Sequence, residues 1–274
     1  MSAPRIVMVL SGGGAKAAAH IGAARALRDA GIVPVHWVAT SMGAPVAAML
    51  AAGEDPDRVL ERFLAVKRRD VLVTRRLVAF RGIWARSIFT PGPLRETISR
   101  LVRPRSFADL AAPLTVTAVE VMTGVEVAFG AGGESAPLID VLCAACALPP
   151  YFPPAMVNGR TFYDGGLRAT VPLRQAVGID CDAVVAIQVA PGFDELGPPV
   201  QVPPPLIAAT DTAMGWLMAG TSELMREQWQ QRPGSRPLIW LRPVSDRGAT
   251  FALDRSGAYA EAGYAAMSAA LGEL

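Results

Sequence analysis

The chain has 274 residues, a net charge of +2 and 51% hydrophobic residues. That length suits one large α/β domain or two smaller ones, with ample apolar material for a core. Three cysteines, an odd number, argue against a disulfide framework. No uncharged apolar run is long enough for a transmembrane helix, and the apolar stretch at the N-terminus is too short for a signal-peptide core. We therefore expect a cytoplasmic protein.

Basic residues are unevenly distributed along the chain. Thirteen of the 26 Lys and Arg residues lie between Arg58 and Arg105, where there are only three acidic residues. Such a segment can form a positive face toward an anionic partner, such as lipid headgroups or nucleic acid. An Arg-rich helical surface that is merely solvated explains the pattern equally well.

The first elements alternate between strands and helices. Residues 6–10 form an apolar run that is typical of a buried parallel strand, and the glycines at 12–14 end it. Residues 15–30 then predict a helix that ends at Gly31. A second strand over 35–39 and a helix over 45–52 follow. This βαβα order predicts a parallel sheet with helices on both faces.

The later elements follow from the same apolar patterns and from the positions of Gly and Pro. No repeat or strong linker divides the chain, so we expect a single domain over 1–274, with a lid-like loop, helices and a late strand in 190–274. The expected elements are a helix at 57–69, a turn at 91–93, a helix at 94–102, paired strands at 114–119 and 125–129, a helix at 137–148, strands at 160–163 and 183–189, a loop at 191–205, a helix at 206–231, a strand at 238–241 and a helix at 254–271.

Ser41 lies on a predicted strand-to-helix turn, between Ala39 and Gly43. Small residues two before and two after a serine are typical of a nucleophile elbow, a sharp turn that exposes the serine oxygen. The alternative is a serine that caps the N-terminus of the following helix. Ala39 stands in place of the first glycine of the elbow motif, so this segment alone does not decide between the two.

The glycine loop before the first helix allows three interpretations. A dinucleotide fingerprint also requires an acidic residue at the end of the second strand, and none is present there. A phosphate-binding P-loop requires Gly before and Ser or Thr after its lysine, whereas Lys16 lies between two alanines. The third interpretation is a set of backbone N–H groups that binds an oxyanion. Neighbouring parallel strands would place this loop and Ser41 at the same edge of the sheet.

A serine nucleophile needs a base, which is usually histidine. The only histidines are His20 and His36, and both precede Ser41, so the usual order of Ser, acid and His is impossible. A carboxylate that is oriented and shielded from water can take this role. Asp164 is the best candidate because the two glycines after it allow a close approach of the backbone. An ordinary Asp-Gly turn is the alternative.

The C-x-x-C pair of Cys143 and Cys146 has alanine neighbours and no second pair. We interpret both cysteines as small core residues rather than as a redox or metal site. We expect no metal ion and no cofactor.

Four segments together resemble the patatin-like phospholipase family. In order they match the family's glycine-rich loop, its nucleophile elbow, its Ala- and Pro-rich middle motif and its D-G-G motif. The matching segments lie within residues 5–189: Ser11-Gly12-Gly13-Gly14-Ala15-Lys16 continuing to Leu27, Thr40-Ser41-Met42-Gly43-Ala44, residues 143–154, and Asp164-Gly165-Gly166 followed by Val171-Pro172.

The resemblance implies a three-layer α/β/α fold with a mostly parallel central sheet. It also implies a Ser-Asp dyad without histidine, with Ser41 as nucleophile and Asp164 as base. In the expected oxyanion hole, Gly12 shapes the glycine loop, and Gly13 and Gly14 donate their N–H groups. The N–H of Met42 adds a further donor. Lys16 supports the loop in the place of the usual arginine. The chain departs from the family pattern at Ala17, Ala39, Cys143 and Thr170.

The expected function is therefore a serine acyl-ester hydrolase that acts on lipids, of the phospholipase A, lysophospholipase or esterase type. The expected partners are a lipid or acyl-ester substrate and the surface of an anionic membrane, and not nucleic acid. A catalytically weakened acyl- or lipid-binding protein is the first alternative. A dinucleotide-binding oxidoreductase is the second. The sequence leaves the acyl length, the head group and the oligomeric state open.

Overall fold

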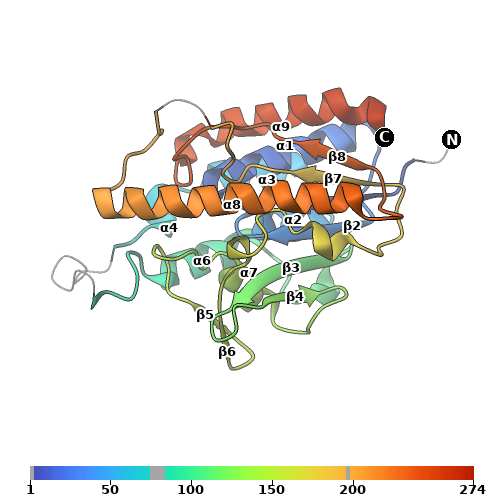
Figure 1. The fold of residues 1–274 in the computed structure, drawn as a ribbon. Helices are drawn as coiled ribbons and strands as arrows, with labels where there is room; N and C mark the ends of the chain where they lie inside the picture. Colours follow the sequence, from blue (N-terminus) through green and yellow to red (C-terminus); the bar gives the residue numbers. More distant parts are fainter. Residues whose placement is uncertain (1–2, 75–83, 196–197) are drawn as a thin grey trace.

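A computed structural model describes residues 3–74, 84–195 and 198–274 (Figure 1). An eight-stranded sheet has the order β5-β6-β3-β2-β1-β7-β8, and β4 pairs with β3. Five neighbouring strands are parallel to one another: β3, β2, β1, β7 and β8. The strands β4, β5 and β6 pair in antiparallel fashion. The strands are β1 (Ile6–Leu10), β2 (His36–Thr40), β3 (Leu114–Glu120), β4 (Glu126–Gly130), β5 (Ala155–Val157), β6 (Arg160–Asp164), β7 (Ala183–Ile187) and β8 (Leu238–Leu241).

Helices cover both faces of this sheet, as expected for three α/β/α layers. In Figure 1, α8 crosses in front of the sheet, and α1 and α9 lie side by side along the top. The helices are α1 (Ala18–Asp29), α2 (Gly43–Ala51), α3 (Pro56–Leu64), α4 (Arg68–Val71), α6 (Pro91–Leu101), α7 (Leu138–Ala145), α8 (Pro205–Gln231) and α9 (Ser256–Ala270).

The alternation of side chains along β1 divides the core into two parts. Ile6, Met8 and Leu10 pack into the larger cluster, together with α1, α2, α7 and α9. Val7 and Val9 face a smaller cluster, which Trp229 of α8 covers. Because successive side chains of a strand point to opposite faces, a fully apolar strand is what a sheet covered on both sides requires.

Two glycines allow α1 and α9 to cross at close range. A Cβ atom on Gly22 would lie 1.8 Å from the carbonyl oxygen of Ala260, and one on Gly263 would lie 1.9 Å from that of Ala19. Larger residues at these positions would therefore separate the helices. This crossing fixes the C-terminal helix against the helix that follows the glycine loop.

Two local predictions were wrong, and one short strand was not predicted. The helix expected at 57–69 is interrupted, because α3 ends at Leu64 and α4 begins only at Arg68. The turn expected at 91–93 is instead the first turn of α6, where Pro91 occupies the first helical position and needs no N–H partner. The short strand β5 was missed. It joins β6 through Asn158 and Gly159, which both have positive φ angles, in a tight hairpin.

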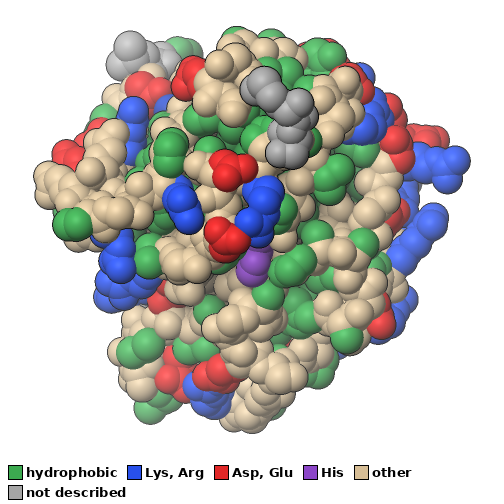
Figure 2. Space-filling view, turned by 90° about the vertical axis from the view of Figure 1, so that its right-hand side faces the viewer, with side chains coloured by type: hydrophobic (Ala, Val, Ile, Leu, Met, Phe, Trp, Pro, Cys, Tyr) green, Lys and Arg blue, Asp and Glu red, His purple; other side chains and the backbone are tan. Residues whose placement is uncertain are grey.

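The expected positive face is only partly within the described residues, since Arg75, Arg76 and Arg81 lie outside them. Several other basic residues of this segment form ion pairs, among them Arg62 with Glu54 and Arg95 with Asp140. Figure 2 shows another face, the right-hand side of Figure 1 away from α4 and α6, where basic and acidic side chains lie next to one another. Within 3–74, 84–195 and 198–274, none of the helices has the length and apolar character needed to cross a membrane.

Candidate active site

The glycine loop and the Ser41 turn meet at the carboxyl edge of two neighbouring parallel strands. Leu10, the last residue of β1, pairs in register with Ala39 of β2. The loop therefore leaves the sheet beside the turn, as the sequence predicted. Open parallel sheets place their functional groups at this edge.

The turn at Ser41 is tight, and the residues around it must be small. Ser41 has a φ of 49°, in the left-handed region that non-glycine residues rarely adopt. A Cβ atom at Gly12 would lie 2.7 Å from the Cβ of Ser41, and one at Gly43 would lie 2.6 Å from the carbonyl oxygen of Ser11. Ala39, where the family pattern has glycine, is fully buried in β2 and is accommodated there.

The Ser41 hydroxyl donates a hydrogen bond of 2.6 Å to Oδ2 of Asp164. The sheet explains how residues so distant in sequence meet. β2 ends at Thr40 opposite Thr117 of β3, and β6 ends at Asp164 opposite Ala118, the next residue of β3. β4 pairs with one edge of β3. The strands β2 and β6 both pair with the other edge, where they meet end to end. Ser41 and Asp164 lie at that junction.

Glycine after the aspartate allows the two strand ends to meet. A Cβ atom at Gly165 would lie 2.4 Å from Oγ1 of Thr40 and 2.5 Å from the carbonyl oxygen of Thr117. The next N–H, that of Gly166, donates a hydrogen bond of 2.8 Å to Oδ1 of Asp164. Each carboxylate oxygen therefore has one donor, which fixes the orientation of the carboxyl group.

Burial controls the acidity of Asp164. The side chain is almost completely buried, which raises its pKa to about 7, although the hydrogen bonds from Ser41 and Gly166 act in the opposite direction. The buried thiol of Cys146 lies nearby and lines the same cavity. A carboxylate with a pKa near 7 is a better proton acceptor than one at its ordinary value.

Two N–H groups of the glycine loop are available for a ligand. The N–H of Gly12 donates to the carbonyl oxygen of Thr170, and that of Ala15 donates to the carbonyl oxygen of Thr250. Within the described parts of the chain, the N–H groups of Gly13 and Gly14 have no such backbone acceptor, and Met42 at the start of α2 has none either. The N–H of Gly12 is thus occupied within the protein, while those of its neighbours can donate to a ligand.

Lys16 lies under this loop and is almost completely buried. Its Nζ lies 2.9 Å from Oε1 of Glu195 and donates to the carbonyl oxygen of Asp246 at 3.0 Å. Burial lowers the pKa of Lys16, whereas the neighbouring carboxylate of Glu195 raises it. The lysine therefore ties the glycine loop to two segments from the last third of the chain.

Neither histidine bonds to the Ser41 hydroxyl in the described residues. Nε2 of His20 lies 2.9 Å from the carbonyl oxygen of Ser11, and complete burial lowers the pKa of His20 to about 4. Nε2 of His36 lies 2.8 Å from the hydroxyl of Thr115. His20 is therefore neutral at ordinary pH and supports the backbone just before the glycine loop.

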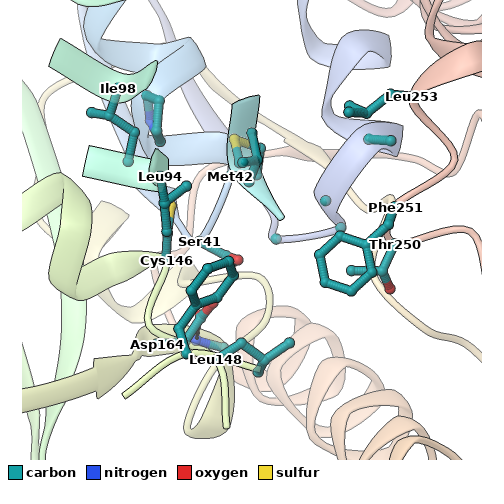
Figure 3. Close-up of a pocket in the computed structure, with 18 of the residues that line it drawn as sticks. Ser41, Met42, Leu94, Ile98, Cys146, Leu148, Asp164, Thr250, Phe251 and Leu253 are labelled. Carbon is teal, nitrogen blue, oxygen red and sulfur yellow. Dashed lines mark hydrogen bonds between the residues drawn. The ribbon is translucent and has the colours of Figure 1, made fainter. Parts of the chain in front are cut away.

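Two neighbouring cavities share part of their walls, and Ser41 lines the inner one. The inner cavity, of about 130 Å³, is lined by Ser41, Asp164 and the glycine loop and by apolar side chains of α3, α4 and α6. The outer cavity, of about 910 Å³, lies along α8. Figure 3 shows Ser41 and Asp164 between the side chains of Leu94, Ile98, Met42 and Cys146 on one side and of Thr250, Phe251 and Leu253 on the other. The two cavities share the residues Leu148, Pro191, Met218, Thr250 and Phe251.

The sequence did not predict the specific contacts that α8 and the C-terminal loops make with Thr170 and the glycine loop. The Thr170 hydroxyl bonds to that of Ser222 on α8, and Thr170 also accepts the N–H of Gly12. A Cβ atom at Gly14 would lie 2.0 Å from the carbonyl oxygen of Thr250. These contacts involve backbone groups or common side chains, which leave no motif in the sequence.

The chain is similar to one family of known proteins. The family model described as patatin-like phospholipase matches residues 8–177. An uncharacterised NTE family protein of Mycobacterium tuberculosis is 31% identical over 197 residues, which are 72% of this chain and 52% of that protein. The human patatin-like phospholipase domain-containing protein 6 is 28% identical over 187 residues, which are 67% of this chain and 13% of that protein. The chain thus spans about half, or less, of the length of these curated relatives.

Two solved structures share the fold at low sequence identity. VipD from Legionella pneumophila superposes with a TM-score of 0.53 at 14% identity, covering 99% of this chain and 67% of VipD. ExoU from Pseudomonas aeruginosa superposes with a TM-score of 0.51 at 16% identity, covering 99% of this chain and 53% of ExoU. From its three-layer fold and the match to the family model, the chain belongs to the patatin-like phospholipase family.

Proposed function

We propose that the protein is a lipid acyl-ester hydrolase that uses Ser41 as nucleophile and Asp164 as base. The observation that supports this most strongly is the hydrogen bond of 2.6 Å between these side chains at the edge of an apolar cavity. The raised pKa of Asp164, about 7, favours transfer of the serine proton to the carboxylate. Family membership and the shared fold support the same class of reaction.

In the proposed first step, the Ser41 oxygen attacks the ester carbonyl carbon and its proton moves to Oδ2 of Asp164. The carbonyl oxygen becomes an oxyanion, which accepts hydrogen bonds from the N–H groups of Gly13, Gly14 and Met42. Collapse of the tetrahedral intermediate breaks the ester bond. The leaving alkoxide takes the proton from Asp164 and departs as an alcohol, which leaves an acyl-enzyme.

In the proposed second step, water attacks the acyl-enzyme and gives its proton to Asp164. The intermediate collapses, the fatty acid leaves, and the proton returns to Ser41. We assign the acyl chain to the inner cavity because its walls are formed largely by apolar side chains. We assign the leaving group to the larger outer cavity, which also contains charged side chains.

The test is hydrolysis of water-soluble and long-chain esters by the wild type, Ser41→Ala and Asp164→Asn. We expect both variants to lose about 10³-fold or more in kcat, because each removes one half of the proton-transfer pair. Covalent labelling of Ser41 by a fluorophosphonate would identify the nucleophile directly. A folded wild type that neither reacts with the label nor hydrolyses any ester would instead indicate an acyl- or lipid-binding protein.

Asp180→Asn is a matched control, since Asp180 is exposed and pairs with Arg5 near the N-terminal end of β1. It should retain wild-type kcat. Asp164→Asn also removes a buried charge, so its melting temperature should not fall at pH values above the pKa of Asp164. A loss of activity that accompanies unfolding in Asp164→Asn would not count as support.

A further inference from the structure

The N-terminal half of α8 exposes a continuous apolar stripe. Its exposed side chains recur at intervals of three and four residues, which places them on one side of the helix. Between positions 205 and 222 the only charged residue is Asp211, which accepts a hydrogen bond from the hydroxyl of Tyr151. We call this set the α8 stripe: Leu206, Ala209, Ala213, Trp216 and Leu217.

The α8 stripe is unusual for a surface helix. Leu206, Trp216 and Leu217 are 70%, 64% and 72% exposed. The opposite side of the same helix forms a wall of the outer cavity, through residues such as Ile207 and Met218. An apolar area that is exposed as one continuous strip commonly marks a surface that binds a partner or a membrane.

The stripe continues to the mouth of the outer cavity. Trp216, Phe193 and Val202 all line this cavity and are also exposed, so they lie at its rim. A molecule that covers the stripe therefore also contacts the mouth of the outer cavity. An aromatic residue such as Trp216 is favoured where an apolar phase meets water.

Charge at the mouth points to an anionic partner. The outer cavity is lined by two acidic and two basic residues. Glu195 pairs with buried Lys16, and Asp211 is bonded to Tyr151, so both acids have partners inside the protein. Arg68 and Arg247 are exposed and form no ion pair with another described residue.

The first turn of α4 adds to this basic rim. Lys67, Arg68 and Arg69 are consecutive and exposed. Figure 1 shows α4 on the same side of the molecule as the N-terminal end of α8, in agreement with the shared cavity wall. Apolar side chains beside basic ones are the surface chemistry that matches the headgroup region of an anionic bilayer.

We propose that the α8 stripe and the basic rim dock the protein on an anionic lipid bilayer, with the outer cavity opening toward the lipid. The proposal rests on the proposed lipid hydrolysis for its biological meaning, but docking itself does not require catalysis. α8 then lies along the interface, and a lipid enters the outer cavity without passing through water. A second copy of this chain, or another segment of a longer protein, are the alternative occupants.

Docking can be measured by sedimentation with vesicles, in a Ser41→Ala background that leaves the lipids intact. We expect binding to vesicles of equimolar phosphatidylcholine and phosphatidylglycerol, weaker binding to phosphatidylcholine alone, and a decrease as salt is added. The combined change Leu206→Glu and Leu217→Glu should weaken binding by about tenfold or more, because each leucine loses apolar contact with the lipid.

Val33→Glu is the matched control. Val33 is 76% exposed but precedes β2, at the edge of the sheet opposite Ser41. This change should leave vesicle binding unaltered. Arg68→Gln combined with Arg247→Gln should reduce the preference for phosphatidylglycerol by several-fold while retaining binding through the stripe.

Three outcomes would overturn the proposal: no vesicle binding, equal loss in Val33→Glu, or a dimer that the leucine changes convert to a monomer in light scattering. Hydrolysis of a water-soluble short-chain ester separates this result from the proposed function. The leucine changes, made in the chain with Ser41, should leave that activity within about twofold, because neither leucine lines the inner or the outer cavity. Absence of that activity from the wild type would contradict the hydrolase and leave the docking result standing.

Discussion

At the scale of single residues, the environment of Asp164 supports its proposed role as a base where histidine is usual. A solvated aspartate is a weak base, with a pKa of about 4. Burial raises the pKa of Asp164 to about 7. The hydrogen bonds from Ser41 and Gly166 keep the carboxylate in one orientation. Together these effects give the residue the basicity and the position that a general base needs.

The pH dependence of activity follows from this environment. Asp164 accepts a proton only when it is ionised, so kcat/KM should rise with pH and level off above an apparent pKa of about 7. The measurement is the pH profile for a water-soluble ester. An inflection close to the ordinary pKa of aspartate would contradict the role of burial.

A histidine could produce a similar inflection, so the profile needs controls. His20→Gln and His36→Gln should retain the inflection, since neither imidazole bonds to Ser41. If either change abolishes the inflection while the protein remains folded, the assignment of Asp164 as the titrating group is wrong.

The residues of the proposed dyad could be predicted because each lies in a local pattern. Ser41 is flanked by small residues, and Asp164 precedes two glycines. The partner of Lys16 could not be predicted, because Glu195 is distant in sequence and belongs to a loop without a motif. The hydrogen bond between Thr170 and Ser222 could not be predicted either, because these residues are distant in sequence and form no motif.

At the scale of elements, apolar runs bounded by Gly or Pro predicted most strands and helices. β1, β2, β7 and β8 are short and apolar, so their pattern was clear. β5 has only three residues and could not be distinguished from a loop. The end-to-end meeting of β2 and β6 along β3, which brings Ser41 and Asp164 together, depends on pairing register and leaves no local signal.

Two glycine substitutions, one at the crossing of α1 and α9 and one away from it, should have opposite effects on the free energy of unfolding. Gly22→Ala places a methyl group 1.8 Å from the Ala260 carbonyl oxygen and should destabilise the protein by about 2 kcal/mol or more. Gly257→Ala, in α9 but with no atom within 4 Å of the new methyl group, should stabilise it by about 0.5 kcal/mol. Denaturant unfolding measures both. Equal effects would show that the helices can separate without loss.

At the scale of the whole molecule, the last third of the chain contributes contacts to the glycine loop and a wall to the outer cavity. The family match ends at residue 177. Yet Thr250 accepts the N–H of Ala15, and Glu195 and Asp246 hold Lys16 under the glycine loop. α8 adds the wall of the outer cavity. The sequence predicted a lid-like loop in 190–274 but not the contacts of Glu195, Asp246 and Thr250 with the glycine loop.

The buried pair of Lys16 and Glu195 should contribute strongly to stability as a unit. Glu195→Gln leaves a buried ammonium without its carboxylate and should lower the free energy of unfolding by about 3 kcal/mol. Adding Lys16→Met removes that unpaired charge and should recover much of the loss. Denaturant unfolding of the single and double variants measures this coupling.

The exposed pair of Arg5 and Asp180 provides the comparison. Asp180→Asn should change the free energy of unfolding by less than about 1 kcal/mol, as is usual for surface ion pairs. Additive effects of Lys16→Met and Glu195→Gln would show that the two buried charges do not depend on each other.

At Ser41 the left-handed backbone favours glycine, whereas the proposed chemistry requires a hydroxyl group. A residue with a side chain costs about 1 kcal/mol more than glycine at a φ of 49°. The turn itself is therefore best served by glycine, and only the hydroxyl group gives serine an advantage. A descendant of this protein that was released from selection for catalysis would gain stability by replacing Ser41 with glycine. A glycine at this position would then accompany loss of the proposed reaction while the surrounding sheet remained intact.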